Sequence, residues 1–248
     1  MNIMTKISIF QELKNKAITN KWIEGKSKGF GDAGITLEAI LGKERENFEL
    51  PDYQGIEIKT KYSIKESYIT LFTAVPDSYL FEIKRIVREY GYPDSNYPEF
   101  KVFNLSLYGN RKKKLNNNYF SIYVDRKNEK VVLRVYDLKH NIIDELTTWS
   151  FEMLKEKLER KLKYLAIIYA VRKLEHNISY YKYTKINCYE LKDFEQFLLL
   201  LENGMIRITF RIGIYKSGKR FGQIYDHGTS FSIDECDINR LFDKIKID

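Results

Sequence analysis

A short stretch of the chain, residues 51–59, reads Pro-Asp-Tyr-Gln-Gly-Ile-Glu-Ile-Lys and brings two carboxylates close to one ammonium group. Residues alternate between the two faces of a β-strand, so Glu57 and Lys59 are expected to point one way while the two isoleucines point into a core. Asp52 arrives beside them from the preceding turn. Two neighbouring carboxylates repel each other unless a divalent cation lies between them, and Mg²⁺ prefers such oxygen ligands. This chemistry suits metal-dependent phosphodiester cleavage, with Lys59 facing the phosphate.

The spacing acid-x4-acid-x-Lys is a weak signal by itself, because 31% of the residues are charged. Its context strengthens it. Pro51 precedes the first acid, isoleucines flank the second, and an upstream helix offers Glu38 toward the same place. A helix glutamate is usually a solvated surface carboxylate, so Glu38 becomes a metal ligand, or an organiser of the metal site, only if it converges with Asp52.

The elements that position these residues mix helices and strands. Helical spacing of apolar residues and capping signals predict helices at residues 7–17, 35–41, 79–90, 150–163 and 191–201. Alternating apolar residues predict strands at residues 56–59, 69–72, 102–107, 120–124, 131–136, 206–215 and 230–233, with a polar tract at 109–118 and a buried strand or helix continuation at 165–171. The order indicates a mixed α/β (α+β) fold in which helices flank a mixed sheet.

No repeat or low-complexity linker divides the chain, so residues 1–248 are expected to form one unit with two lobes. The catalytic lobe is expected to comprise approximately residues 1–100 plus parts of 101–190. A binding lobe is expected mainly at 190–235.

The composition favours a polyanionic partner. There are 42 basic and 34 acidic residues, which give a formal charge of +8 and a pI near 9.1. This excess leaves RNA, DNA and acidic membranes open. The two cysteines, Cys188 and Cys236, are too few for a disulfide framework or a zinc ribbon and fit a reducing cytoplasm. We expect no membrane span, because no apolar run approaches roughly 20 residues, and no secretory signal.

Two dense basic regions lie outside the carboxylate segment. Arg111, Lys112 and Lys113 begin a run that is either a mobile surface loop or a loop that grips backbone phosphates. The segment 211–220 contains Lys216 and Lys219 and matches a phosphate-binding P-loop except at its last position, which is arginine instead of serine or threonine. Nucleotide hydrolysis is therefore not expected.

The same segment contains Gly213-Ile214-Tyr215, a triplet of GIY-YIG nucleases, but no second Tyr-Ile-Gly follows. Downstream, the turn Tyr225-Asp226-His227 offers donors and acceptors that suit base edges in a DNA groove. The three histidines of the chain show no Ser-His-Asp pattern and no metal spacing, so serine hydrolase chemistry has little support.

Several motifs taken together resemble the MvaI/BcnI family of type II restriction endonucleases. They occur in the same order and cover essentially the whole chain. The matching segments are residues 31–38, 50–52, 55–60, 71–73, 149–151, 161–164, 180–183, 211–213, 217–219 and 226–229.

The resemblance implies a PD-(D/E)XK nuclease core, related to MutH-like nickases, in two lobes around a DNA cleft. It implies an active site of Glu38, Asp52, Glu57 and Lys59, with Mg²⁺ held by Asp52 and Glu57 to polarise the scissile phosphate and activate water. Lys59 would orient that water or neutralise developing charge. It further implies a monomer that cuts double-stranded DNA one strand at a time, leaving a 5′-phosphate and a 3′-hydroxyl.

The resemblance to the family's base-reading segment implies that Arg211 and His227 contact DNA. It implies DNA contacts by neighbouring residues of the two basic regions as well. Thr209, Tyr225 and Ser232 depart from the family pattern, which has an acid, a histidine and an arginine there. The bidentate guanine contact that an arginine would make is therefore not expected at Ser232. The implied target is a short GC-flanked site with an odd central base pair, of the CCWGG or CCSGG type.

The implied setting is a bacterial cytoplasm, with a cognate DNA methyltransferase as a functional but not physical partner. Two alternatives stay open: a MutH-like nickase under a partner's control, and a DNA-binding module without catalysis. A GIY-type nuclease centred on Tyr215 is a third and weaker reading.

Overall fold

The structure is a computed structural model that describes residues 3–27, 29, 31–42, 50–62, 68–77 and 79–247. The chain forms two compact units. The first contains Met1–Ile69, Lys157–Lys192 and Ile238–Asp248, and the second contains Thr70–Glu156 and Asp193–Asp237. All predicted site residues lie in the described part of the chain.

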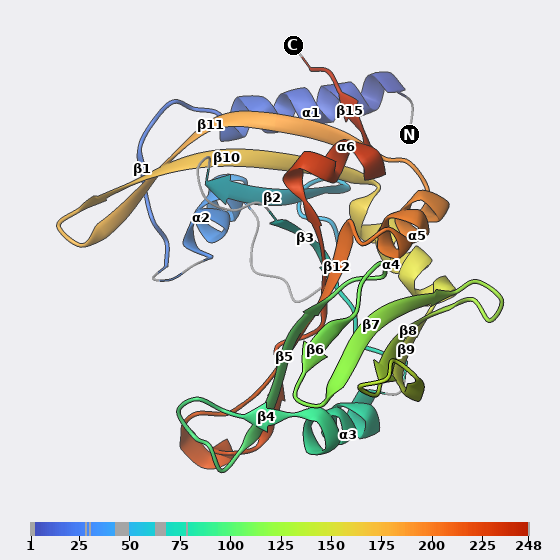
Figure 1. Ribbon diagram of the computed structural model, residues 1–248. Helices are drawn as coiled ribbons and strands as arrows, with labels where there is room; N and C mark the ends of the chain where they lie inside the picture. The colour runs from blue at the N-terminus through green and yellow to red at the C-terminus, as the bar shows by residue number, and fades with distance from the viewer. Residues whose placement is uncertain are drawn as a thin grey trace. The chain divides into compact units, whose positions relative to one another are not determined.

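The first unit is built on a sheet with strand order β1-β11-β10-β2, to which β15 adds by pairing with β11 (Figure 1). Strands β2 and β10 run parallel, and β10 and β11 form a long antiparallel hairpin. The elements are α1 (Ile3–Ala17), β1 (Ile23–Glu24), α2 (Asp32–Ile40), β2 (Ile56–Tyr62), β10 (Tyr164–Glu175), β11 (Ile178–Leu191), α6 (Ile238–Leu241) and β15 (Phe242–Ile245).

One face of this sheet carries the core of the first unit. Phe10 and Leu13 of α1 and Leu37 of α2 pack with Ile56 of β2, and Ile58 lies against the same cluster. Figure 1 shows α1 lying along the β10–β11 hairpin. Because side chains alternate along β2, this packing turns the acidic and basic residues of the strand to the opposite face.

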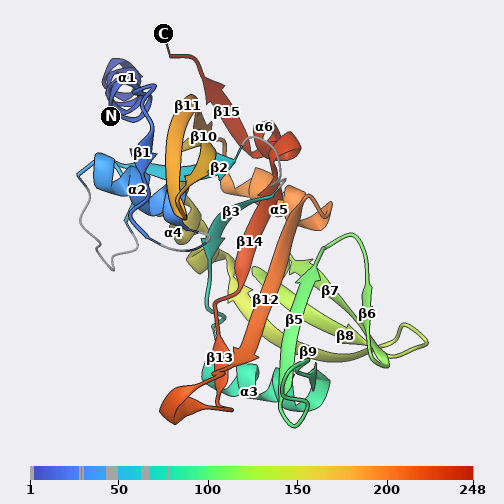
Figure 2. The ribbon, with the colours of Figure 1, turned by 90° about the vertical axis from the view of Figure 1, so that its left-hand side faces the viewer.

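The second unit contains two sheets. Their strand orders are β3-β14-β12-β5-β4, with β13 added to β12, and β6-β7-β8-β9 (Figure 2). The strands are β3 (Tyr68–Thr73), which begins in the first unit, β4 (Tyr92–Pro93), β5 (Lys101–Leu107), β6 (Lys113–Leu115), β7 (Asn118–Asp125), β8 (Lys130–Tyr136), β9 (Ile142–Ser150), β12 (Ile206–Ile214), β13 (Ile224–Asp226) and β14 (Ser230–Asp234).

The helices of the second unit are α3 (Tyr79–Tyr90), α5 (Phe194–Glu202), the 3₁₀ turns η1 (Gly218–Arg220) and η2 (Glu235–Asp237), and the first part of α4 (Phe151–Leu162). Trp149 is fully buried and packs against the buried rings of Phe210 and Phe231. Asp193 caps α5 by accepting a hydrogen bond from the Gln196 backbone N–H at 2.7 Å.

The mixed α+β class is confirmed, and each predicted helix exists. The helix expected at 35–41 begins earlier, at Asp32, whose buried carboxylate accepts hydrogen bonds from the Ser27 backbone and the Thr36 hydroxyl. Residues 165–171 belong to a strand. The polar tract 109–118 is not continuous loop, because β6 lies within it. Among the helices of the described residues, none combines the length and apolar character needed to cross a bilayer.

Candidate active site

A tight turn places Asp52 beside β2. The residues flanking the turn exchange both backbone hydrogen bonds, at 2.9 and 2.8 Å, and the two central residues, Gln54 and Gly55, have φ of 45° and 86°. Positive φ at both central positions is the geometry of a type I′ turn. The chain folds back, and Asp52 Oδ2 accepts a hydrogen bond from the Ile58 backbone N–H at 2.9 Å. The turn therefore anchors the first carboxylate to the strand that carries the second.

Glu57 is the most deeply buried of the predicted catalytic residues, with 2% of its surface exposed. Its Oε1 atom lies 2.5 Å from Lys59 Nζ, while Oε2 is buried without a hydrogen-bond partner in the structure. Burial raises the pKa of the Glu57 carboxyl above its usual range; Lys59 opposes this shift and Asp52 adds to it. The carboxylate thus has one oxygen bound to an ammonium group and one oxygen available to a ligand.

A second lysine reaches this carboxylate. Lys161, in the last turn of α4, places its Nζ 3.6 Å from Glu57 Oε1 and lowers the pKa of that group. Lys161 was not among the site residues predicted from the sequence. It lies more than 100 residues from Glu57 in sequence, within a strongly charged helix, and only the parallel pairing of β2 with the strand after α4 brings the two together.

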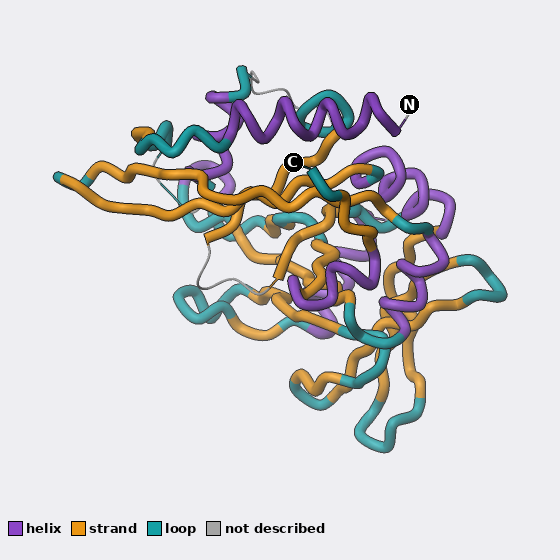
Figure 3. The backbone as a smooth tube through the Cα atoms, turned by 90° about the horizontal axis from the view of Figure 1, so that it is seen from above, coloured by secondary structure: helices purple, strands orange, loops and turns teal. Residues whose placement is uncertain are grey.

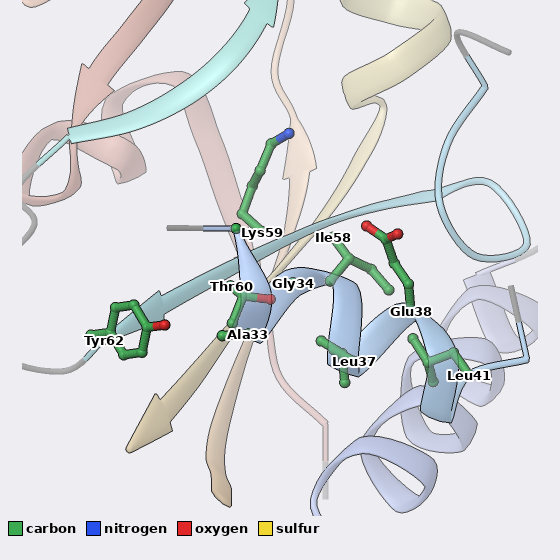
Figure 4. Close-up of a pocket in the computed structure, with 10 residues that line it drawn as sticks. Ala33, Gly34, Leu37, Glu38, Leu41, Ile58, Lys59, Thr60 and Tyr62 are labelled. Carbon is green, nitrogen blue, oxygen red and sulfur yellow. The ribbon is translucent and has the colours of Figure 1, made fainter. Parts of the chain in front are cut away.

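Glu38 lies on the wall of a pocket that Lys59 also lines. This pocket is formed by α2 and β2, with Leu37 and Ile58 among its lining residues. Figure 4 shows the Glu38 carboxylate and the Lys59 ammonium extending to the same side of it. Among the described residues, no three His, Cys, Asp or Glu side chains gather closely enough to hold a metal ion, so Asp52 and Glu57 are not joined by Glu38 in a three-carboxylate cluster.

The predicted DNA-contacting residues lie in the second unit, where Arg211 is held by backbone oxygens. Its Nε donates to the Gly228 carbonyl at 3.0 Å and its Nη2 to the His227 carbonyl at 2.9 Å. The His227 backbone N–H donates to the Arg211 carbonyl at 3.0 Å, and Asp226 accepts a hydrogen bond from the Gly228 N–H at 2.8 Å. Arg211 therefore fixes the shape of the turn that carries His227.

An aromatic row follows the β12–β13 hairpin. The rings of Tyr215 and Tyr225 have centroids 4.6 Å apart, and His227 lies edge-on to Tyr225 at 4.3 Å. Arg220 extends the row by donating a hydrogen bond to the Tyr215 hydroxyl at 3.0 Å. A two-stranded ribbon of this kind can enter a DNA major groove.

The other basic residues of this hairpin stay at the surface. Lys216 lies 3.4 Å from Asp94, and Lys219 lies in the exposed 3₁₀ turn η1. No α-helix follows Gly213 here, because the segment runs from strand through η1 to strand β13. The P-loop-like sequence therefore has no helix N-terminus to receive a phosphate, in agreement with the mismatch in its sequence.

The basic run before β7 is ordered by the chain itself. The Arg111 guanidinium lies 3.8 Å above the Tyr108 ring, and Lys112 Nζ lies 3.8 Å from the Tyr136 ring centroid. Lys113 lies on β6 and pairs with Phe120 of β7. Arg111 and Lys112 lie in a loop, as predicted, with their side chains held by cation–π contacts, but from Lys113 the run continues as strand β6 instead of as loop.

The profile of the MvaI/BcnI restriction endonuclease family matches residues 9–242. The chain belongs to the MvaI/BcnI restriction endonuclease family. It is thus a site-specific deoxyribonuclease, and sequence-specific cleavage of DNA is its activity.

Solved structures agree with this assignment. The complex of the restriction endonuclease MvaI with cognate DNA is 33% identical in sequence, with 99% of this chain and 98% of that chain covered and a TM-score of 0.86. MvaI in the absence of DNA has the same identity and coverage and a TM-score of 0.64. No curated protein matches the chain. The MvaI/BcnI resemblance read from the sequence is confirmed.

Proposed function

We propose that this endonuclease is Mg²⁺-dependent and cuts double-stranded DNA at a short GC-flanked site, acting as a monomer on one strand at a time. Glu38, Asp52, Glu57 and Lys59 form its active site. The observation that carries the proposal is the pairing of buried Glu57 with Lys59 on the strand to which Asp52 is anchored.

The oxygen atoms of the site fit a hard divalent cation. Glu57 Oε2 is buried and lacks a hydrogen-bond partner in the structure, and an oxygen in that position gains most from a cation. Family members generally use a divalent metal. Asp52 and Glu57 would hold Mg²⁺, which supplies charge to polarise the scissile phosphate and acidify water.

The residues of the chain account for the remaining steps. Hydrogen bonding to the Ile58 N–H keeps Asp52 in place. The Lys59 ammonium, which in this structure contacts Glu57, turns to the phosphate or to the attacking water and stabilises the negative charge that develops there. Attack on phosphorus with departure of the 3′ oxygen leaves a 5′-phosphate and a 3′-hydroxyl. Glu38 orients groups at the mouth of the pocket that it shares with Lys59.

The second unit selects the target. Arg211, Tyr225 and His227 supply donors near base edges, and Asp226 supplies an acceptor. Lys216 and Lys219 supply phosphate contacts. At two of the positions that depart from the family pattern, a short hydroxyl side chain pairs with a neighbouring hydroxyl. Thr209 Oγ1 lies 2.9 Å from Ser106 Oγ, and Ser232 Oγ lies 3.4 Å from Thr70 Oγ1. Such pairs cannot replace a bidentate arginine contact to guanine, so we propose a target related to, but different from, CCWGG or CCSGG.

The proposed setting is the bacterial cytoplasm, where a methyltransferase that modifies the same sequence would protect the host DNA. The excess of basic residues supports a nucleic-acid partner.

Digestion of plasmid DNA tests the proposal. Purified protein is incubated with several sequenced plasmids in Mg²⁺ or in EDTA, and the ends of the products are sequenced. We expect discrete fragments in Mg²⁺ only, with one shared sequence at every end. Nicked circles without fragments would indicate a MutH-like nickase instead, and binding without any cut would indicate a module without catalysis.

A further inference from the structure

The catalytic face of the first unit continues beyond the active site. Glu57 and Lys59 point away from the core, and their register partners on β10 are Leu165 and Ile167. Side chains alternate, so the positions of β10 on this same face continue to Lys173. Strand β2 ends at Tyr62, whereas β10 runs on to Glu175, and Figures 1 and 3 show the hairpin tip projecting beyond β2.

Lysines and aromatic rings alternate along this projecting face. On β11, Lys185 pairs with Tyr169 and Tyr180 pairs with Lys173, and Lys182 lies between them opposite Val171. Trp22 immediately precedes β1, and its ring lies 4.8 Å from Lys173 Nζ. We call this set the arm strip; its members are Trp22, Tyr169, Lys173, Tyr180, Lys182 and Lys185.

The arm strip is basic and accessible to solvent, with Trp22 and Lys185 exposed and its other members half-buried. Trp22 is 42% exposed, an unusual state for so large an aromatic side chain. Lys173 Nζ contacts two aromatic rings and forms an ion pair with Glu175 at 2.9 Å, so its positive charge is partly compensated. Lys182 and Lys185 form no ion pair among the described residues.

We propose that the arm strip binds the backbone of duplex DNA outside the cleaved site. This inference rests on the proposed function, because it assumes that DNA lies on the face that carries Glu57 and Lys59. Lysines interleaved with exposed or half-buried rings suit the phosphates and sugars of DNA, and such contacts add affinity without reading sequence. Lys173 lies six residues beyond the partner of Lys59, or roughly 20 Å at about 3.3 Å per residue. This distance corresponds to about six base pairs of B-form DNA.

A duplex-length experiment tests the proposal. Catalytically inactive Lys59→Ala protein in Ca²⁺ is titrated with duplexes that contain one cleavage site and either two or twelve flanking base pairs on each side. The titrations are repeated with the double variant Lys182→Ala/Lys185→Ala, made in the Lys59→Ala protein. As a matched control, Arg172→Ala removes one positive charge from β10 on the opposite face of the sheet.

The long duplex should bind about tenfold more tightly than the short one, and the double variant should lose this advantage. For the double variant on the long duplex, the slope of log K against log salt concentration should become less steep by about two units. The Arg172→Ala protein should keep the full advantage, and circular dichroism should show that both variants are folded. Equal affinity of the parent for both duplexes, or an unchanged advantage in the double variant, would overturn the inference.

The experiment separates this inference from the proposed function. Wild-type protein is also tested for cleavage of both duplexes in Mg²⁺. Absence of cleavage would refute the proposed activity. Cleavage without any effect of flanking length would refute only the role of the arm strip.

Discussion

The segment around β2 and the basic run before β7 each place several charged residues in a short stretch, and the chain surrounds them differently. In the first, Glu57 is buried against Lys59, and one of its oxygens lacks a hydrogen-bond partner in the structure. In the second, Arg111 and Lys112 lie on tyrosine rings at the surface. The first arrangement leaves a polar atom in need of a ligand, whereas the second satisfies its charges within the chain.

This difference shows why charge density alone is a poor guide to a functional site. A buried carboxylate without its full set of partners costs free energy, and it persists where chemistry requires it. A surface cation on an aromatic ring gains about 0.5–1 kcal/mol and needs no partner molecule. We therefore expect mutations in the two regions to differ greatly in their effects.

The largest effect is expected at the active site. Lys59→Ala and Asp52→Asn should each reduce single-turnover cleavage by about 10³-fold or more, because each removes charge that stabilises the transition state. DNA binding in Ca²⁺ should stay within about threefold of wild type, as measured by fluorescence anisotropy. The control is Lys155→Ala, an exposed lysine of α4. A parallel loss of binding and cleavage would mean that these residues act on folding or affinity instead of on the reaction.

A smaller effect, a gain in stability, is expected when Glu57 is replaced. The pKa of Glu57 is raised because burial outweighs the attraction of the lysines, so the ionised carboxylate destabilises the folded chain near neutral pH. In EDTA at pH 7.5, Glu57→Gln should raise Tm by a few degrees, about 2–4 °C for each kcal/mol gained, while it abolishes cleavage.

The dependence of this gain on pH follows from the direction of the shift. A raised pKa in the folded state means that wild-type stability from this group is fully present below the pKa of the unfolded chain and is lost as pH rises through the folded value. The advantage of Glu57→Gln should therefore shrink as pH falls toward 4. A calorimetric difference that grows on acidification would contradict the assignment of this shift to burial.

The smallest effect is expected in the basic run. Arg111→Ala and Lys112→Ala should each weaken DNA binding by less than about threefold, because both side chains are held on rings by cation–π contacts. Each should lower stability by about 0.5–1 kcal/mol, measured by urea denaturation. Lys113→Ala serves as the matched change on β6, because Lys113 makes no cation–π contact with the described residues. A loss of more than tenfold at Arg111 would show that this run grips phosphates directly.

Local patterns in the sequence predicted much of the fold and part of the site. Amphipathic spacing predicted the helix at 79–90 with its observed bounds, and alternation predicted the strand at 206–215 to within one residue. These signals succeed because each depends on residues that are close in sequence. The sequence also placed Glu57 and Lys59 on one face of a strand, as their contact confirms.

Features that depend on distant residues were not predicted. Strand β11 was missed because polar and aromatic residues interrupt its alternation, and its stability comes from pairing with three other strands. Lys161 approaches Glu57 only through tertiary packing. The contacts that order the basic run were not predicted, because the rings that hold Arg111 and Lys112 belong to Tyr108 and Tyr136, which lie outside the run in sequence.

The turn at Gln54 and Gly55 has a consequence for how the enzyme tolerates change. A β-strand repeats every two residues, so a one-residue slip in register would rotate the acid and the lysine inward and present two isoleucines to the substrate. Both central positions have positive φ, which fixes the number of residues in the turn. Insertion or deletion of a single amino acid at this point should thus silence the enzyme even though every catalytic residue is retained.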